Sequence, residues 1–311
     1  MMEVEAAVEL WGRSVARNKL RYTVVVSDGD SKAFNKLSQI QPYGPDVPID
    51  KEDCLNHVGK RCGTALRNLV ADCSKKGVTL GGRGRGRLTA DAVRKLQIYY
   101  SRAIRQNKTA EDMKRAILAS LFHGYSTDNM PQHQYCPPGP DSRCFFKRSI
   151  GNHLYPTGRI KWVYTPLDFD LLHKHLEPLY QRLTNLDLLW RCERKVTQNP
   201  SESFHHSVWS RCSKKNLHSL KRVHFAVISA AAEYNRGPAA ASTVKNVLGF
   251  QVGEDASRLG HARMQKRVER SILQQQQKQN RRRAKRAEAK EKARKEKEAE
   301  EGGPAYQAGM F

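Results

Sequence analysis

Long apolar stretches are missing from this 311-residue sequence. No run reaches the roughly 18 apolar residues of a transmembrane helix, and the N-terminus, MMEVEAAVELWG, lacks the parts of a secretory signal. Acidic residues are scarce as well: 31 Asp and Glu stand against 55 Lys and Arg, which gives a formal net charge of +24. We therefore expect an intracellular protein with no membrane partner that binds a polyanion, and nucleic acid is the first candidate.

Cysteine occurs in a number and spacing that do not suit a disulfide framework. The seven cysteines are irregularly spaced and odd in number, which favours reduced thiols or a metal site. The positive charge is not confined to the C-terminal region. Residues 263–301 hold 15 basic and 7 acidic residues, a net charge of +8, so +16 remains on the rest of the chain. The body of the protein is therefore basic.

The N-terminal pattern predicts an α/β arrangement. Residues 3–19 carry apolar side chains at helical spacing, and the β-rich run Tyr22–Val26 shows no alternation, which is typical of a central strand covered on both faces. Asp28 and Asp30 follow that strand, separated by one glycine. A helix is expected from Lys32 to Ser38.

The rest of the sequence predicts helices. We expect them at residues 51–71, 89–106, 109–124, 167–189 and 218–235, with another that begins near Pro200. From about residue 256 the sequence is charged and of low complexity, which indicates a solvated helix or disorder. Its RRRAKR word could serve as a nuclear import signal, so we expect the protein in the nucleus.

A glycine- and arginine-rich loop, GGRGRGR, covers residues 81–87. Its glycines keep the backbone mobile, and its arginines suit phosphate contacts, although a solvated linker has the same composition. The residues expected to contact DNA are Arg83, Arg85, Arg87, Lys214 and Lys215.

Two carboxylates from distant parts of the chain are candidates for metal chemistry. Asp28 ends the predicted strand, the position where α/β sheets place ligand and metal sites. Asp30 is its alternative, and with Ser31 it could equally cap the following helix. Glu202 lies in the first turn of a predicted helix, where the helix dipole favours an ionised carboxylate. If that helix packs beside the Asp28 strand, the two could hold the divalent ions that phosphodiester chemistry uses.

Several sequence motifs, taken together, resemble those of the Mutator-like transposases, in particular the group widespread in arthropods. They are MEVEAAVELWGRSV, LRYTVVVSDGDSKAF, CLNHVGKRCGTALR, LQIYYSRAIR, HQYCPPGPDSRC and TQNPSESFHHSVWSRCSK, and they span nearly all of residues 1–250. The resemblance implies a ribonuclease-H-like core with an Asp-Asp-Glu triad that cuts and joins DNA, the ends of a transposon, with Mg²⁺ or Mn²⁺. It implies Asp28 as the second aspartate and Glu202 as the glutamate.

A Cys-x-x-His word, Cys54 to His57, matches the one that follows the second aspartate in this superfamily. Its spacing puts both side chains on one helix face, which suits a shared metal or a packed polar contact. His133, Cys136 and Cys144 could complete a four-ligand Zn²⁺ site. The alternative is that these cysteines are simply buried and that a histidine is hydrogen-bonded in the core.

The resemblance also predicts how the chain is divided. We expect part of the ribonuclease-H-like core in residues 1–45, a helical insertion in 46–194, a return to the core in 195–255 and a basic tail in 256–311. The strands that carry the first aspartate are not found ahead of the first helix, so we expect an N-terminally truncated transposase. It would bind DNA, alone or as a homo-oligomer, and be inactive by itself. The alternatives are a non-catalytic nucleic-acid-binding derivative and a basic RNA- or ribosome-associated protein.

Overall fold

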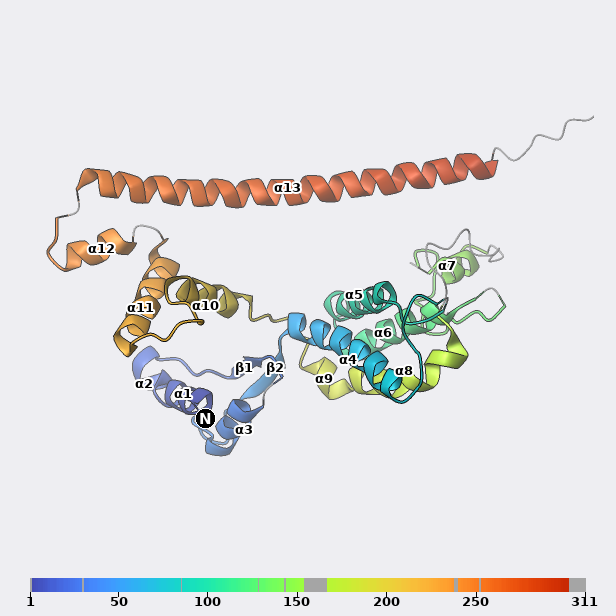
Figure 1. Cartoon of the computed structure of the whole chain (residues 1–311), viewed down its shortest axis with the longest axis horizontal. Coiled ribbons are helices and arrows are strands. Elements are labelled where there is room, and N and C mark those ends of the chain that lie inside the picture. Colours follow the sequence, from blue (N-terminus) through green and yellow to red (C-terminus); the bar gives the residue numbers. More distant parts are fainter. Residues whose placement is uncertain are drawn as a thin grey trace, which may run out of the picture. The chain divides into compact units, whose positions relative to one another are not determined.

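Helices dominate the protein, which divides into two compact units, residues 1–200 and residues 201–311 (Figure 1). The computed structural model describes residues 2–29, 31–84, 86–127, 129–142, 144–153, 167–237, 240–251 and 253–301. The elements of residues 1–200 are α1 (Met2–Gly12), α2 (Ser14–Asn18), β1 (Val24–Ser27), α3 (Lys32–Ile40), β2 (Asp50–Asp53), α4 (Leu55–Lys75), α5 (Ala90–Gln106), α6 (Ala110–Tyr125), α7 (Phe145–Gly151), α8 (Phe169–Leu183) and α9 (Leu186–Trp190). They are followed by α10 (Asn199–Arg211), α11 (Leu220–Arg236), α12 (Ala240–Val247) and α13 (Glu254–Glu301).

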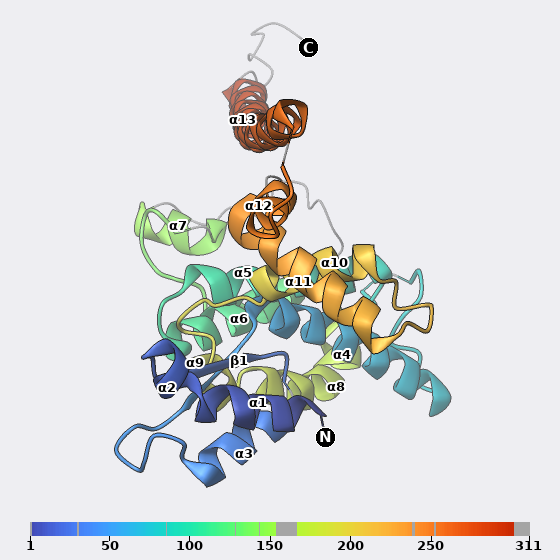
Figure 2. The same cartoon turned by 90° about the vertical axis from the view of Figure 1, so that its left-hand side faces the viewer.

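A parallel β-α-β motif lies at the N-terminal side of the first unit. β1 pairs with β2, with Val24 opposite Asp50 and Ser27 opposite Asp53, and α3 connects the two strands. α1 packs against α3, as both views of the chain show (Figures 1 and 2). The Trp11 indole fixes α1 by donating from Nε1 to the Tyr22 carbonyl at 2.7 Å. The fold is thus mostly helical with a small parallel sheet, compatible with the expected α/β class, while the ribonuclease-H-like core stays a prediction.

The expected burial of β1 on both faces is wrong. All four of its residues are only half-buried. In the part of the chain that the structure describes, the sheet contains β1 and β2 alone. A two-stranded sheet leaves much of each strand in contact with solvent, so the apolar run reflects β propensity more than full burial.

The main hydrophobic core lies among α4, α5, α6, α8 and α9. α4 packs against α5 and α8, and α6 packs against α5 and α9. Apolar stripes of α8 and α5 are buried there; they comprise Leu172, Leu176, Leu179, Leu183, Val93, Leu96, Tyr100, Ala103 and Ile104. The Tyr100 hydroxyl donates to the Leu183 carbonyl at 2.9 Å, which ties α5 to the end of α8. Burial raises the pKa of Tyr100, so the hydroxyl stays neutral.

Helix starts follow local sequence signals where a side chain can cap them. Thr89 accepts a hydrogen bond from the Ala92 N–H, and Thr109 accepts one from the Asp112 N–H, so the expected starts of α5 and α6 are confirmed. Three expected helices differ from the structure. The helix expected at residues 3–19 is interrupted at Arg13. The helix expected at 51–71 begins only at Leu55, because the preceding residues form β2. The stretch 167–189 is divided where Asn185 caps α9.

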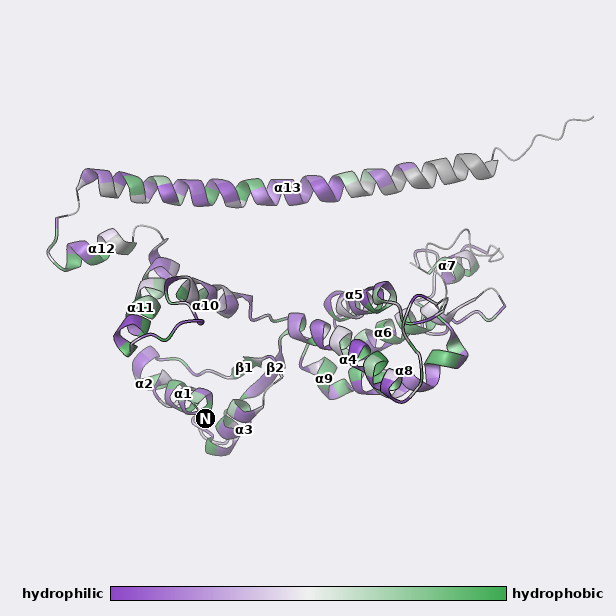
Figure 3. Cartoon of the chain, in the orientation of Figure 1, coloured by the Kyte–Doolittle hydropathy of each residue, from purple (hydrophilic) through white to green (hydrophobic). Residues whose placement is uncertain are grey.

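The second unit has a small core of its own. Val208 of α10 and Cys212, directly after it, pack with Ala226 and Ala230 of α11, and Arg211 forms an ion pair with Glu233. α13 is a helix of 48 residues, mostly hydrophilic in Figure 3, and nearly all its described side chains are exposed. The tail is therefore a solvated helix, one of the two expected outcomes. The finer division of the chain into four segments stays a prediction.

Candidate functional site

Asp28 lies directly after β1, at the edge of the sheet where the carboxyl ends of both parallel strands meet. Its side chain is exposed. The next residue, Gly29, has a φ of +120°, a conformation that favours glycine. A Cβ atom at Gly29 would lie 2.8 Å from Nη1 of Arg61. Glycine is therefore needed here for the backbone turn and for the close approach of a guanidinium beside Asp28.

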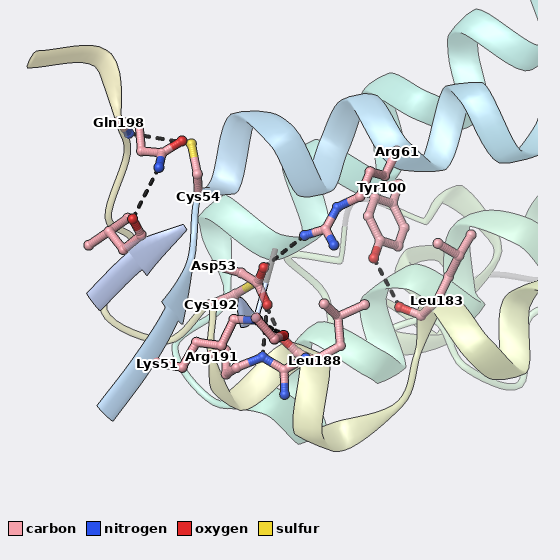
Figure 4. A network of polar contacts seen from close by, with 12 residues as sticks. Lys51, Asp53, Cys54, Arg61, Tyr100, Leu183, Leu188, Arg191, Cys192 and Gln198 are labelled. Carbon is pink, nitrogen blue, oxygen red and sulfur yellow. Dashed lines mark hydrogen bonds and ion pairs between the residues drawn. The ribbon is translucent and has the colours of Figure 1, made fainter. Parts of the chain in front are cut away.

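A buried carboxylate holds that guanidinium in place (Figure 4). Asp53, only 1 % exposed, accepts hydrogen bonds from Arg61 Nη2 at 2.9 Å and from Arg191 Nε at 2.8 Å. The Asp53 N–H also donates to the Arg191 carbonyl at 2.9 Å. Asp53 thereby links the end of β2, the second turn of α4 and the segment after α9. The sequence analysis identified none of the three residues Asp53, Arg61 and Arg191.

A basic cavity extends from Asp28 along α4 and α8. It has a volume of about 770 Å³, and its lining includes Asp28, His57, Lys60, Arg61 and Arg182; we call it the Asp28 groove. Lys60, Arg61 and Arg182 are exposed. Three cations and two carboxylates, Asp28 and Asp72, thus line a groove that is open to solvent, an arrangement suited to a phosphate backbone with a metal ion.

Glu202 lies in the first turn of α10 and is exposed. It belongs to the second unit, whereas Asp28 belongs to the first, so their pairing stays a prediction. The chain just before Glu202 is fixed to the first unit. Gln198 donates from Nε2 to the Val26 carbonyl of β1 at 3.0 Å, and the Asn199 side chain accepts from Asn56 at 2.7 Å. These contacts are made by the last residues of the first unit, before Pro200.

Cys54 and His57 have separate environments from the other expected zinc ligands. Cys54 is fully buried, and its Sγ accepts a hydrogen bond from the Gln198 N–H at 3.4 Å (Figure 4). His57 lines the Asp28 groove. Neither residue belongs to the group of side chains in the described chain that could hold a metal ion. Cys54 and His57 therefore do not join the His133 loop in a four-ligand zinc set, because Cys54 is the N-cap of α4 and His57 lies in its first turn.

The remaining three expected ligands do come together, and His123 joins them. The ligand atoms of His123, His133, Cys136 and Cys144 all lie within 4.8 Å of one another. We call these four residues the His/Cys cluster. It could bind a metal such as zinc. The hydrogen bond from Cys136 lowers the pKa of the Cys144 thiol, and contacts with the two imidazoles act in the same direction.

The residues expected to contact DNA lie in both units. Arg83 and Arg87 line a second cavity, of about 460 Å³, together with Lys95. In the second unit Lys214 and Lys215 are exposed, and Nζ of Lys214 lies 4.9 Å from the centre of the Trp209 ring. Arg85 and the alternative acid Asp30 lie outside the described residues.

Comparison with known proteins identifies the N-terminal part of the chain. In the described residues, no helix combines the length and apolarity needed to cross a bilayer. No curated protein and no solved structure matches the chain. The family model of Mutator-like transposases matches residues 1–144, which include Asp28 and the whole His/Cys cluster. The match supports the resemblance inferred from the sequence over residues 1–144, which are similar to Mutator-like transposases.

Proposed function

We propose that this chain derives from a DNA transposase and acts on DNA, the full enzyme cutting and joining strands with the help of divalent metal ions. The observation that carries the proposal is the position of Asp28, at the end of a parallel strand, within the family match and beside a basic groove. The β1-α3-β2 motif supports a ribonuclease-H-like core, since parallel strands place such carboxylates at one sheet edge.

We propose Asp28 and Glu202 as the carboxylates that hold Mg²⁺ or Mn²⁺. Both side chains are exposed, and carboxylate oxygens are the ligands these ions prefer. When bound, the ions would activate the attacking oxygen and stabilise the leaving oxygen of a phosphodiester. The protein's own part is to present the acids and to neutralise the phosphate backbone with Lys60, Arg61 and Arg182.

Arg83, Arg87, Lys214 and Lys215 are proposed to extend the DNA contact beyond the Asp28 groove. Their positive charge supports this role, and all but the half-buried Arg87 are exposed. We further propose a nuclear location, supported by the RRRAKR word, and zinc as the metal of the His/Cys cluster. Assembly into a homo-oligomer stays a prediction.

Residues 1–311 alone are expected to bind DNA and to cleave it little, because two carboxylates hold a pair of metal ions poorly. The test combines binding to a labelled duplex with nicking of a supercoiled plasmid in Mg²⁺ or Mn²⁺, for the wild type and for Asp28→Asn. Both proteins should bind DNA in a salt-sensitive manner, and neither should nick the plasmid at an appreciable rate.

The two readouts separate the proposed functions. Strong metal-dependent nicking that disappears in Asp28→Asn would establish an active nuclease and refute the expected inactivity. Nicking that survives in Asp28→Asn would refute the role of Asp28. The alternative function, a nucleic-acid-binding protein derived from a transposase, also predicts salt-sensitive binding without nicking. Failure to bind DNA at low salt would refute both.

A further inference from the structure

The His/Cys cluster bridges the end of one helix, a loop and the start of another helix. His123 lies in the last turn of α6, His133 and Cys136 lie in the Pro/Gly-rich loop, and Cys144 is the N-cap of α7. We propose that these four residues form a closed, four-coordinate structural zinc site that holds the loop onto α6. The inference specifies ligands and a role for the proposed zinc, and it does not depend on DNA cleavage.

The distances between the four ligand atoms fit one tetrahedral ion. With Zn–N bonds of about 2.0 Å and Zn–S bonds of about 2.3 Å, tetrahedral geometry requires roughly 3.3 Å between nitrogens and roughly 3.5 Å between nitrogen and sulfur. The two Nδ1 atoms of His123 and His133 lie 3.2 Å apart. The Cys144 Sγ lies 3.4 Å from Nδ1 of His133 and 4.0 Å from Nδ1 of His123. The Cys136 Sγ lies 3.7 Å from Nδ1 of His123 and 4.0 Å from Nδ1 of His133.

The surroundings of His133 favour Nδ1 as a metal-binding atom. Its Nε2 lies 3.0 Å from the Ser126 hydroxyl, which can accept a hydrogen bond from Nε2–H, and in that tautomer Nδ1 carries a lone pair. That lone pair is directed toward Nδ1 of His123, so the two nitrogens must share a proton or a cation. Two adjacent thiols make a cation the better occupant, because thiolates and imidazoles are the ligands zinc prefers.

Most of the site is buried, and its four side chains can fill the four positions of a tetrahedral ion, although His123 is half-buried and lines a cavity of about 790 Å³ with Cys136 and Cys144. His133, Cys136 and Cys144 are each more than nine-tenths buried. The His133 ring stacks on Phe146 with 4.4 Å between ring centres, and the edge of Phe145 lies near both imidazoles. Four protein ligands in an apolar surrounding characterise a structural zinc site, whereas a catalytic one keeps a position for water.

Few buried apolar side chains hold the loop, beside a ring contact of Tyr135 with Phe122 and a hydrogen bond from the Gln132 N–H to the Ser126 hydroxyl. The hydrophobic cluster at this end of the first unit contains Ala119, Cys136 and Cys144 as buried members, with Tyr135 and Phe146 partly buried. So small a core contributes little to stability, and metal binding would supply the folding free energy of this segment.

The experiment measures zinc content and loop protection in the full chain. Wild-type protein, purified without added chelator, should contain about one zinc per chain, and both His123→Ala and Cys144→Ser should lose most of it. His123→Cys should retain zinc, since Cys₃His sites are equally closed. Cys54→Ser is the matched control, a buried cysteine outside the cluster, and should keep its zinc. Limited proteolysis should cut the loop much faster in His123→Ala, and faster in wild type after chelation.

Several results would overturn the inference. Zinc lost in Cys54→Ser but kept in Cys144→Ser would preserve the proposed zinc and refute this ligand set. Absence of zinc from the wild type after reconstitution would refute the metal altogether. Zinc present without any change in loop cleavage would refute the structural role. DNA binding, measured on the same preparations, reports separately on the proposed function.

Discussion

Replacing Asp53 by Asn is expected to lower the free energy of unfolding of the first unit by about 3 kcal/mol. The neutral amide would leave Arg61 and Arg191 without the buried carboxylate that both contact, and one of its own groups would lack a suitable partner. The loss is at the lower end of the range for buried ion pairs because each arginine side chain is more than a third exposed. Urea unfolding followed by tryptophan fluorescence measures it.

Asp50→Asn is the matched control on the same strand. Asp50 pairs with Arg194 at 3.2 Å, but both side chains are more than half exposed, so its loss should cost under about 1 kcal/mol. Equal effects of the two substitutions would contradict the role given to Asp53. Because Arg61 lies against the Gly29 turn, Asp53→Asn should also loosen the end of β1 beside Asp28.

Leu66→Ala is expected to destabilise the first unit by about 3 kcal/mol. Leu66 is fully buried in the core that α4 forms with α5, so its removal loses apolar contacts and leaves a cavity. The midpoint of urea unfolding should fall without a large change in the slope of the transition.

Ile98→Ala provides the comparison on the facing helix. Ile98 lies on α5 but is 45 % exposed, so its truncation should cost under about 1 kcal/mol. A small effect of Leu66→Ala, or an effect of Ile98→Ala as large, would contradict the packing of α4 against α5.

Elements with strong local signals could be predicted from the sequence. The expected starts of the helices at 89 and 109 depend on residues within one or two helical turns, and the structure reproduces them with Thr89 and Thr109 as caps. β2 was missed because its residues, DKED, have no β propensity. β2 forms a strand because β1, 26 residues earlier in the chain, supplies its backbone hydrogen-bond partners. Asp53 can be buried because Arg61 and Arg191 donate hydrogen bonds to its carboxylate.

The candidate metal ligands were likewise predicted where they lie close together in the sequence and missed where they do not. His133, Cys136 and Cys144 stand in one short loop and were identified together. His123 was missed because it sits in the last turn of a helix, where a single histidine has no distinctive spacing. Cys54 and His57 had the more familiar spacing, yet Cys54, the N-cap of α4, accepts a hydrogen bond from Gln198, and His57 lines the Asp28 groove.

The central claim, that the Asp28 groove holds DNA, is tested most directly by the salt dependence of DNA affinity. The measurement compares wild type with the double variant Lys60→Gln, Arg182→Gln and with a control, Arg17→Gln, Lys36→Gln, which removes two exposed charges elsewhere in the first unit. We expect the groove variant to bind a labelled duplex about tenfold more weakly and to lower the slope of log K against log salt by about 2. The control should change both much less. An unchanged affinity and slope in the groove variant would contradict the account.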